Sequence, residues 1–316
     1  MAKKSPPLTL VYPAERAVIP NGLPGIFLYG AAPAGARLLV NGVKAAVYKT
    51  GSWLVYIPVH TGNFDINLHC RAGGKTYTYK RSVFINEPPQ PPAPRKTERL
   101  KAGPASRKIP SSQFTKAQPL KGLKVFLDPG HSFVPRHEHD GKTSPQGIYE
   151  HKINYQIALA ARRKLRAMGA FVKLSKKYKE QMDLPTRTDK AHGWGADIFL
   201  SIHNNSWPDN VNPFRQKNGY GFYYYYRRSV PLARALERSY RRHIKELPDE
   251  GIKFADFSVT RNSPQIPAVL IESAYITLPE HEALLLKPAF IERLARAIAE
   301  GVLDFANPQA AANLIK

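Results

Sequence analysis

Cysteine is nearly absent from this sequence, because its 316 residues include only one, Cys70. A single cysteine excludes a disulfide within the chain and a zinc site made of thiolates. Cys70 ends the strand-like run Phe64–Cys70, so we expect it to be a small buried hydrophobe and not a reactive thiol. Any metal site in this chain must therefore use histidine or carboxylate ligands.

Long apolar runs are also missing. No stretch of about 18 apolar residues occurs, which excludes a transmembrane helix of ordinary length. The first residues, Met1–Pro7, include two lysines but are not followed by the apolar segment of a secretory signal peptide. Two explanations stay open at this point: the protein is cytosolic, or a signal peptide was removed from this sequence.

Acidic residues are scarce, with 24 Asp and Glu against 47 Lys and Arg, a formal net charge of +23. Residues 1–86 carry 10 Lys and Arg against 2 acidic residues, 87–124 carry 9 against 2, and 125–316 carry 28 against 20. The basic front half should attract a polyanion such as nucleic acid, anionic lipid or an anionic cell-wall polymer. We expect no nucleic-acid partner, because the sequence contains no nucleic-acid-binding motif and alternate tyrosines of Tyr223–Tyr226 should face the core.

Residues 1–86 have the pattern of a small all-β module. Turn signals such as Asn41-Gly42 and Gly73-Gly74 separate short apolar or alternating runs. About seven strands in roughly 80 residues predict an immunoglobulin-like sandwich. Prolines and basic residues fill 87–120, which we interpret as an extended linker whose cations either bind a polyanion or only solvate the spacer. The predicted strands are Leu8–Tyr12, Gly25–Tyr29, Arg37–Val40, Ala45–Tyr48, Trp53–Val59, Phe64–Cys70 and Tyr77–Ile85.

Residues 121–308 alternate between strands and helices, which predicts an α/β domain. The strand runs are continuously apolar, as in a mostly parallel sheet that helices cover on both faces. We expect residues 309–316 to be a frayed tail. The predicted strands are Lys124–Leu127, Phe171–Leu174, Asp197–Ile202, Gly221–Tyr226, Ala268–Ile271 and, more weakly, Phe257–Thr260; the predicted helices are Glu150–Met168, Pro185–Trp194, Pro231–Lys245 and Ala289–Phe305.

Four segments of this domain end in residues suited to a zinc site. Three apolar runs lead to His131, His203 and Glu272, and Glu150 stands where a helix begins. Ligands of open α/β sheets bind beyond the carboxyl ends of the strands, so one rim can collect all four side chains. Two His and a Glu are a known ligand set for one catalytic Zn²⁺ ion, which lowers the pKa of its water to about 7. We assign His131, Glu150 and His203 as zinc ligands and Glu272 as the catalytic carboxylate.

Each of these residues alone has an ordinary structural explanation. A histidine at a strand end can be a satisfied polar group, and Glu272 can be an ion-pair partner. Glu150 can stabilise the N-terminus of its helix by its interaction with the helix macrodipole. Their joint occurrence in one α/β frame is what favours the metal site.

Six segments between Lys124 and about Phe305 match the pattern of a known family in its order: Leu127–His131, Gly147–Glu150, Leu184 with Arg187, Gly195–Asn205, Gly219–Tyr223 and Pro267–Glu272. With them, this stretch resembles the zinc-dependent N-acetylmuramoyl-L-alanine amidases of the amidase-3 type, which cut the amide bond between muramic acid and the stem peptide of peptidoglycan. The resemblance implies the same three ligands and the same catalytic Glu272. Asn205 matches a residue that supports the site in relatives, and capping of a loop is the alternative.

Three segments depart from the family pattern. Ser132–Asp140 replaces a glycine-rich stretch, and its His137 and His139 are either rival ligands or members of an exposed polar loop. Ser175-Lys176-Lys177 stands where a Thr-Arg pair is common, and 274–278 replaces the usual Gly-Phe-x-Ser-Asn. All four site residues remain, so we expect an active enzyme.

The resemblance implies a peptidoglycan hydrolase that cleaves the bond between N-acetylmuramic acid and L-alanine with zinc-activated water. Its partners would be peptidoglycan and, through the basic front half, an anionic wall polymer, and we expect a monomer. Because the substrate lies outside the cytoplasm, we expect an extracytoplasmic location, in the periplasm or cell wall, with the signal peptide absent from this sequence. The alternatives are an inactive wall-binding protein of the same fold and a zinc peptidase that acts on free peptides.

Overall fold

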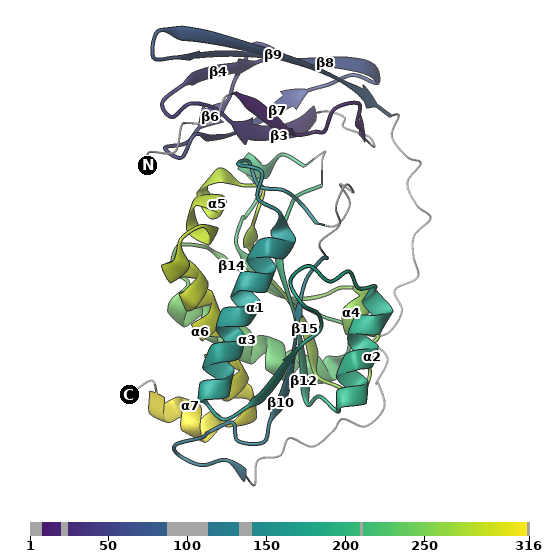
Figure 1. Cartoon of the computed structure of the whole chain (residues 1–316), viewed down its shortest axis with the longest axis vertical. Coiled ribbons are helices and arrows are strands. Elements are labelled where there is room, and N and C mark those ends of the chain that lie inside the picture. The colour runs from purple at the N-terminus through teal and green to yellow at the C-terminus, as the bar shows by residue number, and fades with distance from the viewer. Residues whose placement is uncertain (1–7, 20–24, 87–112, 133–140, 209–210, 315–316) are drawn as a thin grey trace.

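The computed structural model describes residues 8–19, 25–86, 113–132, 141–208 and 211–314. A β-sandwich lies against one end of a larger α/β domain (Figure 1). The expected linker falls largely outside the described residues, as do His137 and His139. The boundaries 1–86, 87–120, 121–308 and 309–316 therefore stay predictions.

The N-terminal region is all-β, as predicted, and consists of two sheets. One sheet has the order β1 (Thr9–Tyr12), β3 (Gly25–Ala31), β7 (Ser52–Pro58), β6 (Ala46–Val47). The other has the order β2 (Val18–Ile19), β9 (Lys75–Ile85), β8 (Gly62–Ala72), β4 (Arg37–Val40), β5 (Val43–Lys44). Strand β8 buries every second side chain, and Cys70 is fully buried among them, as expected of a core hydrophobe.

The second region contains a six-stranded sheet in the order β11 (Phe171–Leu174), β10 (Lys124–Pro129), β12 (Ile198–Asn205), β15 (Ala268–Tyr275), β13 (Tyr220–Tyr224), β14 (Asp249–Phe254). The first four strands are mutually parallel, and β13 pairs antiparallel with β15. The prediction of a mostly parallel sheet is thus confirmed. Its carboxyl edge gathers the ends of β10, β12 and β15, where the predicted site residues stand.

Helices cover both faces of this sheet (Figure 1). The large apolar core lies between one face and helices α1 (Glu150–Ala167), α3 (Val230–His243) and α6 (Pro288–Ala306). Helices α2 (Leu184–Trp194) and α4 (Ser258–Arg261) cover the other face around a smaller cluster. The remaining elements are α5 (Pro279–Leu285), α7 (Pro308–Leu314) and the short 3₁₀ turns Pro213–Arg215 and Arg227–Ser229.

Two predictions of secondary structure were wrong. Residues 257–260 form no strand, because the chain turns into α4 there, and the edge strand is instead β14, whose sequence is Asp-Glu-Gly-Ile-Lys-Phe. The expected frayed tail is helical through Leu314, and its Ala311 is buried against the main core. Pro308 occupies the start of that helix, where a missing N–H has no cost.

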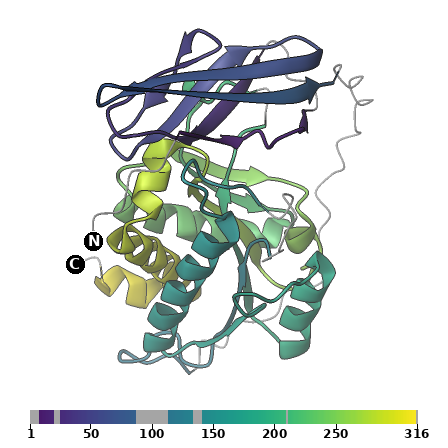
Figure 2. The ribbon, with the colours of Figure 1, turned by 45° about the horizontal axis from the view of Figure 1, so that its top comes forward.

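The sandwich packs directly on the α/β domain, a contact that both Figure 1 and Figure 2 show. Phe27, Tyr29 and Leu54 of the β1-β3-β7-β6 sheet form one buried cluster with Tyr275 and Leu278 of the α/β domain. Hydrogen bonds reinforce the cluster, since the buried Ser52 hydroxyl donates to Glu282 Oε2 at 2.5 Å. The two regions are therefore joined by a packed interface.

Candidate metal centre

Three of the predicted site residues converge at the carboxyl edge of the sheet. His131 Nε2 lies 3.1 Å from Glu150 Oε2, and His203 Nδ1 lies 3.4 Å from Glu150 Oε1. One ligand atom from each of the three side chains lies within 4.8 Å of the other two. The residues come from the turn after β10, the first turn of α1 and strand β12, so only the fold brings them together.

Two glycines make room for this cluster. A Cβ atom on Gly130 would stand 2.2 Å from the His203 ring, so no larger residue fits there without displacing the histidine. Gly141 has φ +92°, and a Cβ atom on it would stand 2.8 Å from the His131 ring. His131 itself has φ 59°, a left-handed conformation that costs a non-glycine residue free energy and often marks a functional site.

Glu150 is held by a set of donors in addition to the histidines. Its Oε1 accepts hydrogen bonds from Asn154 Nδ2 at 3.0 Å and from the Asn204 backbone N–H at 3.1 Å. Its Oε2 accepts from the Lys142 backbone N–H at 3.2 Å. Burial alone would raise the pKa of Glu150, but the two histidines outweigh burial and hold this pKa well below its usual value. The carboxylate is therefore ionised and fixed in orientation.

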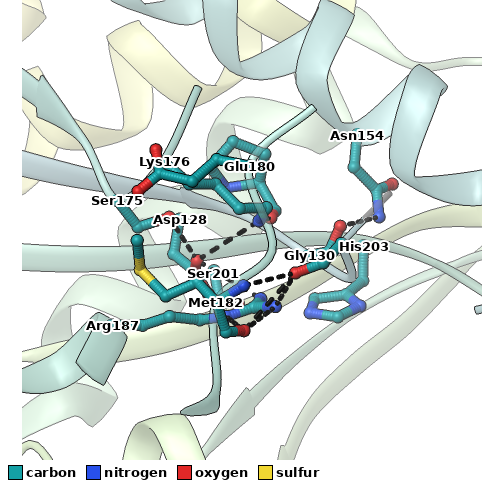
Figure 3. A network of polar contacts seen from close by, with 12 residues as sticks. Asp128, Gly130, Asn154, Ser175, Lys176, Glu180, Met182, Arg187, Ser201 and His203 are labelled. Atoms are coloured by element: carbon teal, nitrogen blue, oxygen red, sulfur yellow. Dashed lines mark hydrogen bonds and ion pairs between the residues drawn. The ribbon is translucent and has the colours of Figure 1, made fainter. Parts of the chain in front are cut away.

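A second buried network surrounds Asp128, three residues before His131 in the sequence (Figure 3). Asp128 is fully buried and accepts hydrogen bonds from Ser175 at 2.6 Å and from Ser201 at 2.8 Å. Arg187 lies 3.4 Å from the same carboxylate, and Lys176 donates to the Pro129 carbonyl. Burial raises the pKa of Asp128, but the charges of Arg187 and Lys176 outweigh burial, so its pKa is lowered.

Glu272 stands beside the metal-binding cluster on the neighbouring strand. It is the direct register partner of His203 in the β12–β15 pair, and it lines the same cavity. Burial and the negative charge of Glu150 raise its pKa well above the usual value. Within the described residues, its buried Oε2 has no hydrogen-bond partner. A carboxyl group of high basicity beside a candidate metal site is suited to proton transfer.

The cavity at this edge has a volume of about 320 Å³. Asn205 also lines it, and its Oδ1 accepts a hydrogen bond from the Ser206 backbone N–H at 2.7 Å. The hydrogen bond agrees with capping of a loop, and the place in the cavity lining agrees with a supporting role, so both predictions for Asn205 stay open. The lining residues are His131, Gly141, Lys142, Glu150, His203, Asn204, Asn205, Ser206 and Glu272.

The residues present fit a zinc ion. Bonds of about 2.0–2.2 Å in a tetrahedral site place ligand atoms roughly 3.3–3.6 Å apart. The spacings of 3.1 Å and 3.4 Å around Glu150 lie near that range, and one ligand atom of each of the three side chains lies within 4.8 Å of the other two. The burial of His203 lowers its pKa, which favours the neutral imidazole that metals bind. These observations fit a zinc site that uses two nitrogens and one carboxylate and leaves a position for water.

Comparison with known protein families identifies the domain. A family model described as N-acetylmuramoyl-L-alanine amidase matches residues 125–304, more than half of the chain. The chain belongs to this amidase-3 family. The matched range begins in β10 and ends in α6, so it contains the six-stranded sheet except Lys124, and the sandwich lies outside it.

Several amidases are similar to this chain. The N-acetylmuramoyl-L-alanine amidase LytC of Bacillus subtilis is 31% identical over 187 residues, which are 59% of this chain and 36% of that protein. The amidase CwlM of Bacillus licheniformis is 32% identical over 57% of this chain and 67% of its own length. Among solved structures, the amidase AmiC2 of Nostoc punctiforme has a TM-score of 0.53 at 28% identity, over 58% of this chain and 98% of that one.

The departures from the amidase-3 pattern have specific places in the structure. Ser175 and Lys176 supply a hydroxyl and a cation to the Asp128 network, the same chemistry that a Thr-Arg pair offers. Tyr275 and Leu278, in the segment that replaces Gly-Phe-x-Ser-Asn, form part of the contact with the sandwich. Asp128, Asn154 and Lys142 were not among the predicted site residues, although Asp128 lies only three residues before His131 in the matching segment Leu127–His131.

Proposed function

We propose that this protein is a zinc-dependent peptidoglycan amidase that hydrolyses the bond between N-acetylmuramic acid and L-alanine. The observation that carries the proposal is the convergence of His131, Glu150 and His203 beside Glu272 in one cavity. Membership of the amidase-3 family and the names of its similar proteins support the choice of substrate. This chain covers only 36% of the length of the first of those relatives. The assignment of the substrate therefore rests on the amidase-3 domain alone.

The roles of the residues follow from their positions. His131, Glu150 and His203 would hold Zn²⁺, which polarises a carbonyl oxygen and makes water acidic when it is bound. Asn154 and the Asn204 backbone N–H keep the Glu150 carboxylate in its orientation, as outer contacts commonly do for ligands. The Asp128 network holds the Pro129–His131 turn in place.

Glu272 would move the proton that hydrolysis requires. Water adds its oxygen to the lactyl carbonyl carbon, and Glu272 accepts the proton that water releases. The carbon–nitrogen bond then breaks, and Glu272 donates that proton to the departing amine of L-alanine. A raised pKa suits this double role, because the group must hold the proton between the two steps. The products are a muramoyl lactyl carboxylate and a free peptide amine.

The position and partners of the protein follow from the same proposal. Peptidoglycan lies outside the cytoplasm, so we infer an extracytoplasmic site of action. In the described part of the chain, no helix combines the length and apolar character that a bilayer crossing requires. The basic front half would hold the enzyme on an anionic wall polymer. Binding of the full chain to sacculi should then weaken steadily as salt is raised.

Metal analysis combined with digestion of purified peptidoglycan tests the proposal. The parent should bind one zinc per chain and release free lactyl carboxylates, while Glu272→Ala should keep zinc and lose about 10²–10⁴-fold in rate. Glu280→Ala serves as a matched control, because Glu280 is exposed on α5 and does not line the cavity. A zinc-loaded parent that leaves the wall intact would indicate a binding protein, and cleavage of free peptides alone would indicate a peptidase.

A further inference from the structure

Among the described residues that line the cavity, Lys142 is the one lysine or arginine. The other titratable groups there are the carboxyl groups of Glu150 and Glu272 and the two histidines. Lys142 is held close to the metal-binding cluster by its backbone. Its N–H donates to Glu150 Oε2 at 3.2 Å, and its carbonyl accepts from the Glu150 N–H at 2.9 Å. The ammonium group therefore extends from a fixed point at the edge of the site.

The Lys142 side chain reaches an aromatic ring of the sandwich. The Lys142 ammonium lies 5.0 Å from the centre of the Tyr12 ring, a cation–π distance. Tyr12 ends strand β1, and its ring is stacked on those of Phe27 and Tyr29 at 5.8 Å and 5.4 Å. Phe27 and Tyr29 are buried in the interface cluster, so the Tyr12 ring rests on a rigid support.

The sandwich also supports the other end of the segment that joins Lys142 to Glu150. The Gln146 backbone N–H donates to Glu282 Oε1 at 2.8 Å, and the Gln146 side chain donates to the Ser52 hydroxyl at 3.2 Å. Ser52 belongs to β7 and donates in turn to Glu282. Residues 142–150 are thus braced by the sandwich at two points, one of which is the side chain of Lys142.

We propose that Lys142 binds a carboxylate of the peptide part of the substrate and that Tyr12 of the sandwich positions it for this contact. The inference rests on the proposed function, because it concerns the same cavity. A muramoyl peptide has a neutral sugar next to the scissile amide and free carboxylates farther along its peptide. An ammonium group at the rim of a cavity that otherwise contains carboxylates would pair with such a group and orient the peptide. Lys142 would then determine specificity, and Tyr12 would be a positioning residue.

The test compares two substrates in the full-length protein. One is an N-acetylmuramoyl tripeptide with free carboxylates, and the other is the same compound with every carboxylate amidated. Lys142→Met should raise KM for the free-carboxylate compound about tenfold, with kcat changed less than about twofold, because one charge-assisted hydrogen bond is lost. For the amidated compound, the parent and Lys142→Met should have similar KM values. Lys142→Arg should restore most of the preference.

Variants of Tyr12 separate positioning from general damage. Tyr12→Leu should raise KM for the free-carboxylate compound about threefold, and Tyr12→Phe, which keeps the ring, should behave like the parent. Lys44→Met changes an exposed lysine of the sandwich far from the cavity lining and should have no effect. Zinc content should be equal in all variants, which shows that the metal site is intact.

The outcomes distinguish the two proposals. If the parent hydrolyses both compounds and Lys142→Met raises both KM values alike, or neither, the carboxylate contact is wrong and the amidase function stands. If the parent hydrolyses neither compound, the proposed function is wrong. In that case, calorimetry can measure the binding of both compounds to the parent and to Lys142→Met. If the substitution lowers the affinity for both compounds equally, the proposed carboxylate contact is wrong.

Discussion

The sandwich and the α/β domain are both built around sheets with apolar cores, but they differ in the polar groups that they bury. In the described part of the sandwich, Ser52 is the one buried residue with a polar side chain apart from the aromatic Tyr29 and Trp53, and it faces the other domain. The α/β domain buries Asp128, Glu150, Lys176 and Arg187. A buried charge is costly unless it is paired, so a domain that keeps several such charges has a use for them.

The charged pairs of the sandwich lie at its surface. Asp65 lies 2.8 Å from Lys80, and both side chains are about half exposed or more. Such pairs contribute little to stability. The contrast indicates that substitutions at buried polar groups should have larger effects than matched substitutions at the surface of the sandwich, and four experiments sharpen this comparison.

The largest difference should appear at histidines. His203→Ala removes a proposed ligand and should abolish zinc binding, with a loss of more than about a hundredfold in hydrolysis, since even outer contacts of metal ligands commonly cost 10–100-fold. His69→Ala changes an exposed histidine of β8 and should leave zinc binding and the rate of hydrolysis unchanged. The measurements are zinc content by atomic absorption and release of lactyl carboxylate. Retention of stoichiometric zinc by His203→Ala would contradict the assignment.

Aspartates should show the next difference. Asp128→Asn keeps the shape of the side chain but leaves the buried cations Arg187 and Lys176 without their partner, and should cost about 3–5 kcal/mol in the free energy of unfolding. Asp65→Asn is its match in the sandwich and should leave the urea midpoint unchanged. If the two variants unfold at the same urea concentration, the expected difference between the buried and the exposed aspartate is wrong.

Acid should destabilise the α/β domain through His281. Burial lowers the pKa of His281 from 6.5 to about 4, and its Nδ1 accepts a hydrogen bond from the Tyr275 N–H at 3.0 Å. Between those pH values the unfolded chain binds a proton that the native state does not, so stability falls as pH falls, by about 3 kcal/mol in all.

His281→Asn offers a matched control for that effect, because its Oδ1 can accept the same hydrogen bond and it does not titrate. The variant should lose less stability than the parent between pH 6.5 and 4, as measured by urea unfolding at each pH. Identical pH profiles for the two proteins would show that His281 is not the responsible group.

The smallest difference should appear at serines. Ser52→Ala removes a donor from the buried Glu282 carboxylate and should cost about 1–2 kcal/mol. Ser82→Ala removes an exposed hydrogen bond to Asp65 within the sandwich and should have no measurable effect. Thermal unfolding of both variants tests whether Ser52 contributes to the interface, and equal midpoints would argue that it does not.

Much of the fold was predictable because buried strands and amphipathic helices have strong local patterns. The run 124–127 and the helix that starts at Glu150 were placed within a residue or two of their observed bounds. Strand β14 escaped prediction because it lies at the sheet edge, is only partly buried, and therefore lacks an apolar run. Helix α7 had usable signals, namely Pro308 at its start and three successive alanines.

The candidate site was predictable in its residues but not in its supports. His131, Glu150, His203 and Glu272 each stand next to a strong strand or helix pattern, so their meeting followed from general rules of α/β sheets. The contact of Lys176 with the Pro129 carbonyl joins residues that are 47 positions apart. No local pattern encodes such a pair, because its partners are chosen by the packing of two neighbouring strands.

The sequence by itself determined a basic all-β front region, an α/β domain and four residues suited to zinc chemistry, because alternation, apolar runs and family motifs are local properties. The tertiary structure alone decided that the sandwich packs against the α/β domain and that Tyr12 contacts Lys142, a residue of the cavity lining. Contacts between separately folded regions depend on the shape and charge of whole surfaces, and these exist only after each region has folded.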